Sequence, residues 1–219
     1  MKKRLIAALL LGAITLPALQ GCFPVVVAGV GTGVAATLDR RTLGTQTEDE
    51  SIEWKAGSRV GDKLKDRGHF NFTSYNRKVL ISGEVVSEEV KSEVERIVAS
   101  IPNVQGVHNE LVVGPSSSLS NRSNDAFITS KVKSRSIDAG KFNPLHIKVV
   151  TEAGTVFLLG MVTQAEADAA INVARTTAGV RKVVPLMEII APAKARELDV
   201  TQSDSKPASA PAPVEQRAQ

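Results

Sequence analysis

An internal repeat constrains the fold of this chain more than any other feature. Residues 78–85 (Lys-Val-Leu-Ile-Ser-Gly-Glu-Val) align with residues 155–162 (Thr-Val-Phe-Leu-Leu-Gly-Met-Val). The matched positions are Val79 with Val156, Gly83 with Gly160, and Val85 with Val162. Because similarity at a fixed spacing marks a repeated structural unit, we expect two copies of one small domain, each about 65 residues long.

Each copy is expected to fold as αββαβ, which makes the chain an α+β protein with two tandem domains. In the first copy, hydrophobic periodicity predicts helices over 52–64 and 90–101 and strands over 70–73, 78–86 and 105–113. In the second copy it predicts a helix from Ser123 or Asn124 to about Ile137, a second helix opened by the capping box Thr163–Glu166, and strands over 147–151, 156–162 and 181–190. Asp125 falls in the first turn of its helix, where an acid complements the helix dipole.

Composition divides the chain into six segments. They are an export signal (1–21), a glycine-rich tether (22–45), a first domain (46–114), a polar linker (115–123), a second domain (124–191) and a tail (192–219). The tail is made of Ala, Pro, Ser, Gln and charged residues without an apolar pattern. It cannot bury enough apolar surface to offset the entropy of ordering, so we expect it to be disordered.

The N-terminus has the layout of a bacterial export signal. Three basic residues at 2–4 precede an apolar run over 5–16 that is too short to span a bilayer as a mature helix. The following Leu19-Gln20-Gly21-Cys22 resembles the lipobox of bacterial lipoproteins, which implies that Cys22 begins the mature chain and carries the lipid. Phe23, rather than Asp, follows the cysteine, so the same resemblance implies the periplasmic face of the outer membrane. The alternative is an ordinary secretory signal followed by an incidental cysteine.

The charge of the mature protein argues against nucleic acid as a partner. The full chain carries 27 basic and 23 acidic residues, but three of the basic residues leave with the signal. Because the remaining charge is close to zero, an anion-binding surface has to be a local patch.

Motifs for catalysis and for cofactors are missing from the sequence. Gly29, Gly31 and Gly33 imitate a dinucleotide-binding loop, but that pattern requires its third glycine where Val34 stands. The three histidines share no helix-face spacing, and the acidic pair at 88–89 suits a helix N-terminus. We therefore expect neither enzymatic activity nor a metal or other cofactor.

Four short motifs in the repeat resemble the BON (bacterial OsmY and nodulation) domain family. They are Val79-x-x-x-Gly83-x-Val85, Gly106-Val107-x-Asn109, Asn124-Asp125-x-Phe127-Ile128-Thr129-x-Lys131-Val132 and Glu152-x-Gly154-x-Val156-Phe157-Leu158-x-Gly160. The resemblance implies non-enzymatic periplasmic proteins that contact phospholipid and maintain envelope integrity. For the family's dual-domain outer-membrane lipoproteins, it further implies binding of anionic phospholipid through the second domain and association with division sites.

The first helix of the second copy offers a candidate phospholipid-binding surface. Phe127, Lys131 and Ser134 share a face beside the expected core residues, and Lys133, Arg135 and Ile137 flank or end it. An aromatic ring with neighbouring cations suits a membrane interface, because the ring enters the headgroup boundary while the cations meet phosphate. The alternative is that Phe127 belongs to the core and the cations form a solvated helix face.

Two further readings stay open. In the first copy, Trp54 lies on a helix with Arg59, Lys63, Lys65 and Arg67, which makes a second candidate surface. The alternative function is a periplasmic scaffold, in which envelope-assembly or peptidoglycan-associated proteins dock on the sheet edges.

Overall fold

A computed structural model describes residues 39–204. The expected export signal, Cys22 and most of the tether lie outside these described residues. Within the described residues, both copies of the repeat belong to one compact unit. No helix between residues 39 and 204 is both long enough and apolar enough to cross a bilayer.

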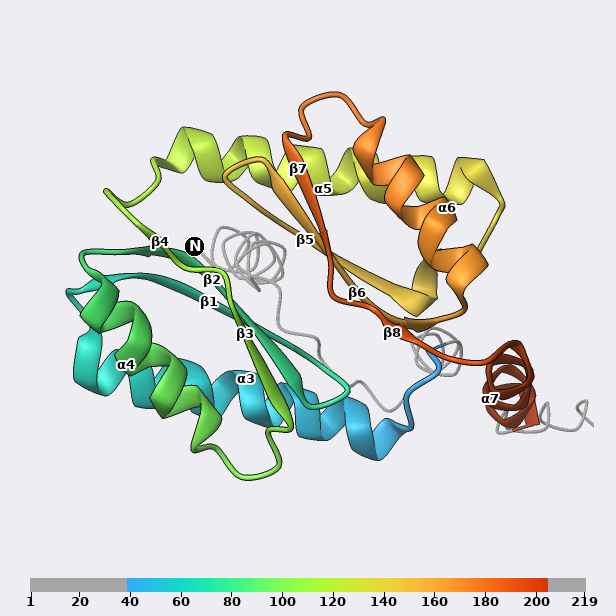
Figure 1. Cartoon of the computed structure of the whole chain (residues 1–219), viewed down its shortest axis with the longest axis horizontal. Helices are drawn as coiled ribbons and strands as arrows, with labels where there is room; N and C mark the ends of the chain where they lie inside the picture. The colour runs from blue at the N-terminus through green and yellow to red at the C-terminus, as the bar shows by residue number, and fades with distance from the viewer. Residues whose placement is uncertain (1–38, 205–219) are drawn as a thin grey trace, which may run out of the picture. The chain divides into compact units, whose positions relative to one another are not determined.

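Both copies adopt the expected αββαβ order (Figure 1). The first copy contains α3 (Leu43–Leu64), β1 (Gly68–Tyr75), β2 (Lys78–Val85), α4 (Glu88–Ala99), β3 (Gly106–Asn109) and β4 (Val112–Val113). The second contains α5 (Leu119–Ala139), a 3-10 turn η2 (Pro144–His146), β5 (Ile147–Glu152), β6 (Thr155–Val162), α6 (Gln164–Arg175), β7 (Lys182–Pro185) and β8 (Glu188–Ile189). The last strand of each copy was expected to be continuous and is instead two short pieces.

The second strand of each copy is the centre of its sheet. In the first copy β2 pairs antiparallel with β1 and parallel with β3 and β4. In the second, β6 pairs in the same way with β5, β7 and β8. The two repeated glycines let the hairpin strands approach closely, since a Cβ at Gly83 would lie 2.1 Å from the His69 carbonyl oxygen and one at Gly160 would lie 2.4 Å from that of His146. The close approach of the two strands, which leaves no room for a Cβ, explains why both copies have glycine at the same position of the central strand.

One face of each sheet forms a core with the two helices of its own copy. In the first copy, Ile52 and Val60 from α3 pack with Val94 from α4 against β2. In the second copy, Ile128 and Val132 from α5 pack with residues of α6 against β6. The helices therefore owe their position to apolar stripes, as the periodicity predicted.

The other faces of the two central strands share a third apolar cluster. Tyr75 and Leu80 of the first copy are buried together with Phe157 and Leu159 of the second. Because successive side chains of a strand point to opposite faces, burial on both faces accounts for the almost continuous apolar run of β6. Ion pairs between the copies accompany the cluster, Lys78 with Glu188 and Lys148 with Glu53, each at 2.9 Å.

The first helix of each copy begins earlier than expected. Helix α3 starts at Leu43, where the Thr42 hydroxyl accepts from the backbone N–H of Thr45, so the expected tether over 22–45 ends within it. Helix α5 starts at Leu119, capped by Ser118 through the N–H of Asn121, so the second half of the expected 115–123 linker is helical. Asp125 accordingly lies in the second turn of α5 and not in the first.

The segment after residue 191 begins with a helix, α7 (Pro192–Asp204), where disorder was expected from residue 192 (Figure 1). Asp199 on this helix accepts a hydrogen bond from Arg40 Nε at 2.8 Å, and Ala195 is buried. A contact with a residue far back in the sequence therefore supplies the order that the composition of the segment did not suggest. Residues 205–219 lie outside the described part of the chain.

Candidate functional site

The outer face of α5 carries the residues expected to bind phospholipid. The inner face is fixed by Ile128, Val132 and Ser136, which are buried. With 3.6 residues per turn, the opposite face of the helix contains Phe127, Ser134 and Ile137. These three side chains therefore project from one continuous helix.

Phe127 is not a core residue, because 61% of its surface is exposed. The Nζ atom of Lys131 lies 4.7 Å from the centre of the Phe127 ring, within the range of a cation–π interaction. Ile137 is 68% exposed and lies about 15 Å further along the helix axis at 1.5 Å per residue. Phe127 and Ile137 therefore both project outward from α5, whose first residue, Leu119, is also exposed.

The cations around this face differ in their contacts. Lys133 is exposed and lies about 120° around the helix axis from Phe127, on the opposite flank from Lys131. Lys131 Nζ donates to the carbonyl oxygen of Ala178 in the loop after α6. Arg135 donates to the Thr177 hydroxyl at 2.9 Å and to a carbonyl oxygen at the end of α6. Lys131 and Arg135 therefore also fix α5 against α6, a structural role that the sequence did not suggest.

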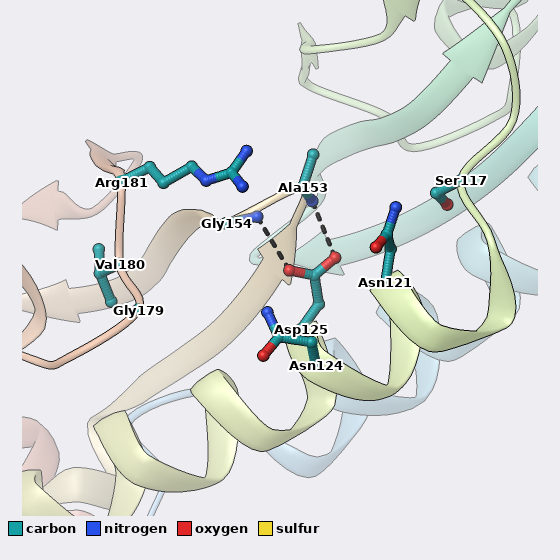
Figure 2. Close-up of a pocket in the computed structure, with 9 residues that line it drawn as sticks. All are labelled: Ser117, Asn121, Asn124, Asp125, Ala153, Gly154, Gly179, Val180 and Arg181. Atoms are coloured by element: carbon teal, nitrogen blue, oxygen red, sulfur yellow. Dashed lines mark hydrogen bonds between the residues drawn. The ribbon is translucent and has the colours of Figure 1, made fainter.

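A pocket of about 440 Å³ adjoins this surface. Figure 2 shows its lining, which comes from the start of α5, the β5–β6 turn and the loop before β7: Ser117, Asn121, Asn124, Asp125, Ala153, Gly154, Gly179, Val180 and Arg181. Gly179 connects the pocket with the α5 surface, since a Cβ at Gly179 would lie 3.4 Å from Lys131 Nζ.

Asp125 is buried beneath the pocket and has a role that the sequence reasoning missed. The backbone N–H groups of Ala153 and Gly154 donate to its two carboxylate oxygens at 2.9 Å each, as the dashed lines of Figure 2 show. Both of these turn residues have positive φ, 48° and 73°, as a two-residue type I′ hairpin turn requires. Because alanine rarely adopts this conformation, the carboxylate stabilises a turn that the side chains disfavour.

The first copy repeats this arrangement with Asp49. Its carboxylate accepts from the backbone N–H groups of Asn76 and Arg77 at 2.8 and 2.7 Å, and these turn residues again have positive φ. The Ser74 hydroxyl and Arg41 also donate to it. The signal was present in the alignment, because Asp49 and Asp125 precede their central strands at nearly equal distances.

Residues from both ends of the described chain meet in a partly buried ionic cluster. Arg40 is 4% exposed and donates to Glu166 at 2.8 Å and to Asp199 at 2.8 Å. Burial opposes ionisation of Glu166, but hydrogen bonds from Arg40 and Thr163 outweigh it and lower the pKa of this carboxyl. His146 borders the cluster, and burial together with the charge of Arg40 lowers its pKa below the ordinary value.

The other candidates form no metal centre among the described residues. Across residues 39–204, no group of three or more His, Cys, Asp or Glu side chains is placed to hold a metal ion. On α3, Trp54 is 74% exposed, and the basic residues named with it in the sequence are exposed as well: Arg59, Lys63, Lys65 and Arg67.

Comparison with known proteins finds one family and several relatives. The model of the BON domain matches residues 48–115 and again 124–191. The outer membrane lipoprotein DolP of Haemophilus influenzae is 37% identical over 185 residues, which cover 84% of this chain and 95% of that protein. The 21 kDa hemolysin of Actinobacillus pleuropneumoniae is 32% identical over 155 residues, covering 70% of this chain and 80% of that protein.

Among solved structures, a structural protein of the type III secretion system of Chlamydia trachomatis, CdsD, aligns at 13% identity. The alignment covers 68% of this chain and 97% of that chain, with a TM-score of 0.27.

Proposed function

Since the chain belongs to the BON domain family, we propose that it is an outer-membrane lipoprotein that binds anionic phospholipid through the outer face of α5. In this proposal Cys22 carries the lipid anchor, and the protein supports envelope integrity on the periplasmic side, including at the division site. The observation that carries the lipid-binding part is the exposed pair Phe127 and Ile137 on one helix face, with Lys131 and Lys133 on its two flanks.

The anchor is supported by the sequence and by the relative named as an outer membrane lipoprotein. Cys22 is the only cysteine of the chain, and it stands where the lipobox pattern requires it. Between Cys22 and Asp39 the chain can extend at most about 60 Å, at about 3.5 Å per residue. An acylated Cys22 therefore confines both domains to a thin layer next to the bilayer.

The α5 surface is suited to weak membrane contact. Phe127 and Ile137 offer apolar area to the headgroup boundary, while Lys133 contributes about 1 kcal/mol of attraction to an anionic leaflet. A single contact of this size is too weak to hold a soluble protein. Tethering raises the effective concentration at the bilayer, so the same contact becomes sufficient for an anchored one.

A vesicle-binding experiment on fragment 34–219 tests the lipid site. We expect binding to vesicles containing phosphatidylglycerol and little binding to pure phosphatidylcholine, with amide shifts concentrated on α5. Phe127→Ala should weaken binding about tenfold, from the loss of roughly 1.5 kcal/mol of apolar burial. Lys133→Glu should weaken it about thirtyfold at low salt, since it replaces one attraction by one repulsion of about 1 kcal/mol each.

Matched controls come from the first copy. Leu43→Ala on α3 removes an apolar side chain that is 62% exposed, close to the 61% of Phe127, and Lys63→Glu reverses another exposed cation. Both should bind vesicles as the wild type does, and all four variants should keep the wild-type unfolding midpoint. If the controls lose binding and the α5 variants do not, the assignment to α5 is wrong. Failure of the unmodified fragment to prefer anionic vesicles would instead favour the scaffold function.

The anchor has a separate test in cells. The full chain should incorporate radiolabelled palmitate and fractionate with the outer membrane, whereas Cys22→Ala should lose the label and appear in the soluble periplasmic fraction. Continued labelling of Cys22→Ala would refute the anchor without affecting the α5 site.

A further inference from the structure

The outer face of α3 has a composition that the proposed function does not use. Trp54 is 74% exposed, the largest exposed fraction among the large aromatic side chains of the described residues. Figure 1 shows α3 along the first sheet, and its inner side carries the buried residues Ile52, Ala56 and Val60. At 3.6 residues per turn, Trp54 points directly away from them.

The residues around Trp54 form a continuous strip along this face. Helical periodicity places Glu50, Gly57, Ser58, Gly61 and Lys65 within about 60° of Trp54 around the axis. Glu50 and Lys65 are exposed. A Cβ added at Gly57 or at Gly61 would meet no atom within 4 Å, so the surface beside the tryptophan is open. We call Glu50, Trp54, Gly57, Ser58, Gly61 and Lys65 the Trp54 strip.

The order of these residues is self-complementary when two copies of α3 run antiparallel. If a two-fold axis passes between Gly57 and Ser58, Gly57 of one copy faces Ser58 of the other. Trp54 then faces Gly61, where an indole meets a residue without a side chain, and Glu50 faces Lys65. By symmetry each of these contacts occurs twice.

We propose that the Trp54 strip is the docking surface for a second copy of this chain, with the two α3 helices antiparallel. Charge decides the orientation, because a parallel pair would bring Glu50 against Glu50 and Lys65 against Lys65. Antiparallel packing also points the two helix dipoles in opposite directions, which is the favourable arrangement for neighbouring dipoles. The small residues at the centre let the axes approach to the 8–10 Å typical of packed helices.

The contact is small and its affinity is correspondingly low. From Glu50 to Lys65 the strip is about 22 Å long, at 1.5 Å per residue. A single helix pair of this length buries less than the roughly 1,200 Å² of a standard stable interface. The dimer is therefore weak in solution and becomes populated when molecules are concentrated, as confinement beside a membrane would do.

Cross-linking of single-cysteine variants tests the geometry. Fragment 34–219 lacks Cys22 and has no cysteine of its own, so one engineered thiol reports one position. Ser58→Cys lies next to the proposed axis and should be cross-linked by a short bismaleimide at high protein concentration. Thr47→Cys lies on the same exposed face but about 30 Å from its counterpart in the antiparallel pair, and should not be. Equal cross-linking at both positions would mean a parallel or nonspecific contact and would overturn the proposal.

Charge reversal tests the pairing by sedimentation equilibrium. Glu50→Lys and Lys65→Glu should each weaken self-association about fivefold, because each loses two exposed ion pairs. The double variant restores opposite charges and should return to the wild-type constant. Trp54→Ala should weaken association at least tenfold, as expected for a central aromatic. A double variant as weak as its parents, or a Trp54→Ala fragment that associates like the wild type, would refute the antiparallel dimer.

Discussion

The buried aspartate beneath each hairpin turn is predicted to stabilise the fold through its hydrogen bonds to the turn, and substitution of Asp125 tests this directly. Asp125 is 5% exposed, and both of its carboxylate oxygens accept backbone N–H groups of the β5–β6 turn. Asp125→Ala removes both acceptors at once. The N–H groups of Ala153 and Gly154 then lose charged partners, in a turn whose alanine already has a φ of 48°.

The expected cost follows from the number and type of these hydrogen bonds. A hydrogen bond to a charged group contributes about 1.5–3 kcal/mol, and solvent that enters the vacated space recovers part of two such bonds. We therefore expect Asp125→Ala to lower the free energy of unfolding by about 3 kcal/mol. Asp125→Asn keeps one carbonyl acceptor and should lose about half as much.

Urea unfolding of fragment 34–219, followed by circular dichroism, measures the difference. Asp138 is the matched control, because it is an exposed acid on the same helix. Asp138→Ala should stay within about 0.5 kcal/mol of the wild type, as surface substitutions usually do. If Asp125→Ala also falls within that range, the carboxylate does not hold the turn, and the parallel role of Asp49 in the first copy fails with it.

Three further expectations concern single contacts. Gly160→Ala should lower the free energy of unfolding by more than about 3 kcal/mol in the same urea assay, because its Cβ would lie 2.4 Å from the His146 carbonyl oxygen. Gly57→Ala should raise it by about 0.5–1 kcal/mol, because Gly57 lies in open space on a helix. The free energy of unfolding of the wild type should fall as the pH drops below about 6.5, because the pKa of His146 is lowered in the folded state and the unfolded chain therefore binds the proton first. His146→Asn should reduce the change of the urea midpoint between pH 5 and 7.5. Asp199→Ala should speed amide exchange in α7 while leaving β6 unchanged, since Arg40 keeps its bond to Glu166; equal exchange in both proteins would mean that the ion pair does not hold the helix.

The strands and the order of elements were predictable because their causes are local. Period-two alternation and turn residues locate the hairpins, and the alignment of Gly83 with Gly160 marks the close approach within each sheet. The capping box at Thr163 was likewise readable, and its reciprocal hydrogen bonds are present. Such features depend on residues a few positions apart, which a single sequence displays.

The helix starts were not predictable, because each first helix buries an acid on its inner face. Asp49 and Asp125 occupy inner-face positions where an amphipathic pattern calls for an apolar residue, so the stripe of apolar residues begins only at Ile52 and Ile128. The helices in fact begin two turns or more before these residues. A buried carboxylate is favourable only when its partners are in place, and those partners lie 27–29 residues away in the hairpin turns.

The order of α7 depends mainly on a contact that is distant in the sequence. Arg40 and Asp199 are separated by 159 residues, and neither belongs to a motif. A charge in a tail usually stays in water, because an exposed ion pair contributes little. Arg40 is nearly inaccessible and already donates to Glu166, so the Asp199 carboxylate accepts from a guanidinium that the fold already holds in place. Only the folded chain brings these three groups together.

The two copies share one fold and differ where they face outward. Their sheets bury Leu80 and Phe157 in one common cluster, which removes these strand faces from contact with other molecules. The outer faces of α3 and α5 remain available, and they have diverged in charge and shape. The α5 face carries Phe127 between two flanking lysines, which suits a planar anionic surface. The α3 face pairs an acid and a base around a tryptophan and glycines, which suits a second helix of the same sequence. Duplication of one domain therefore provides two surfaces of different chemistry on a pair of sheets that share an apolar cluster.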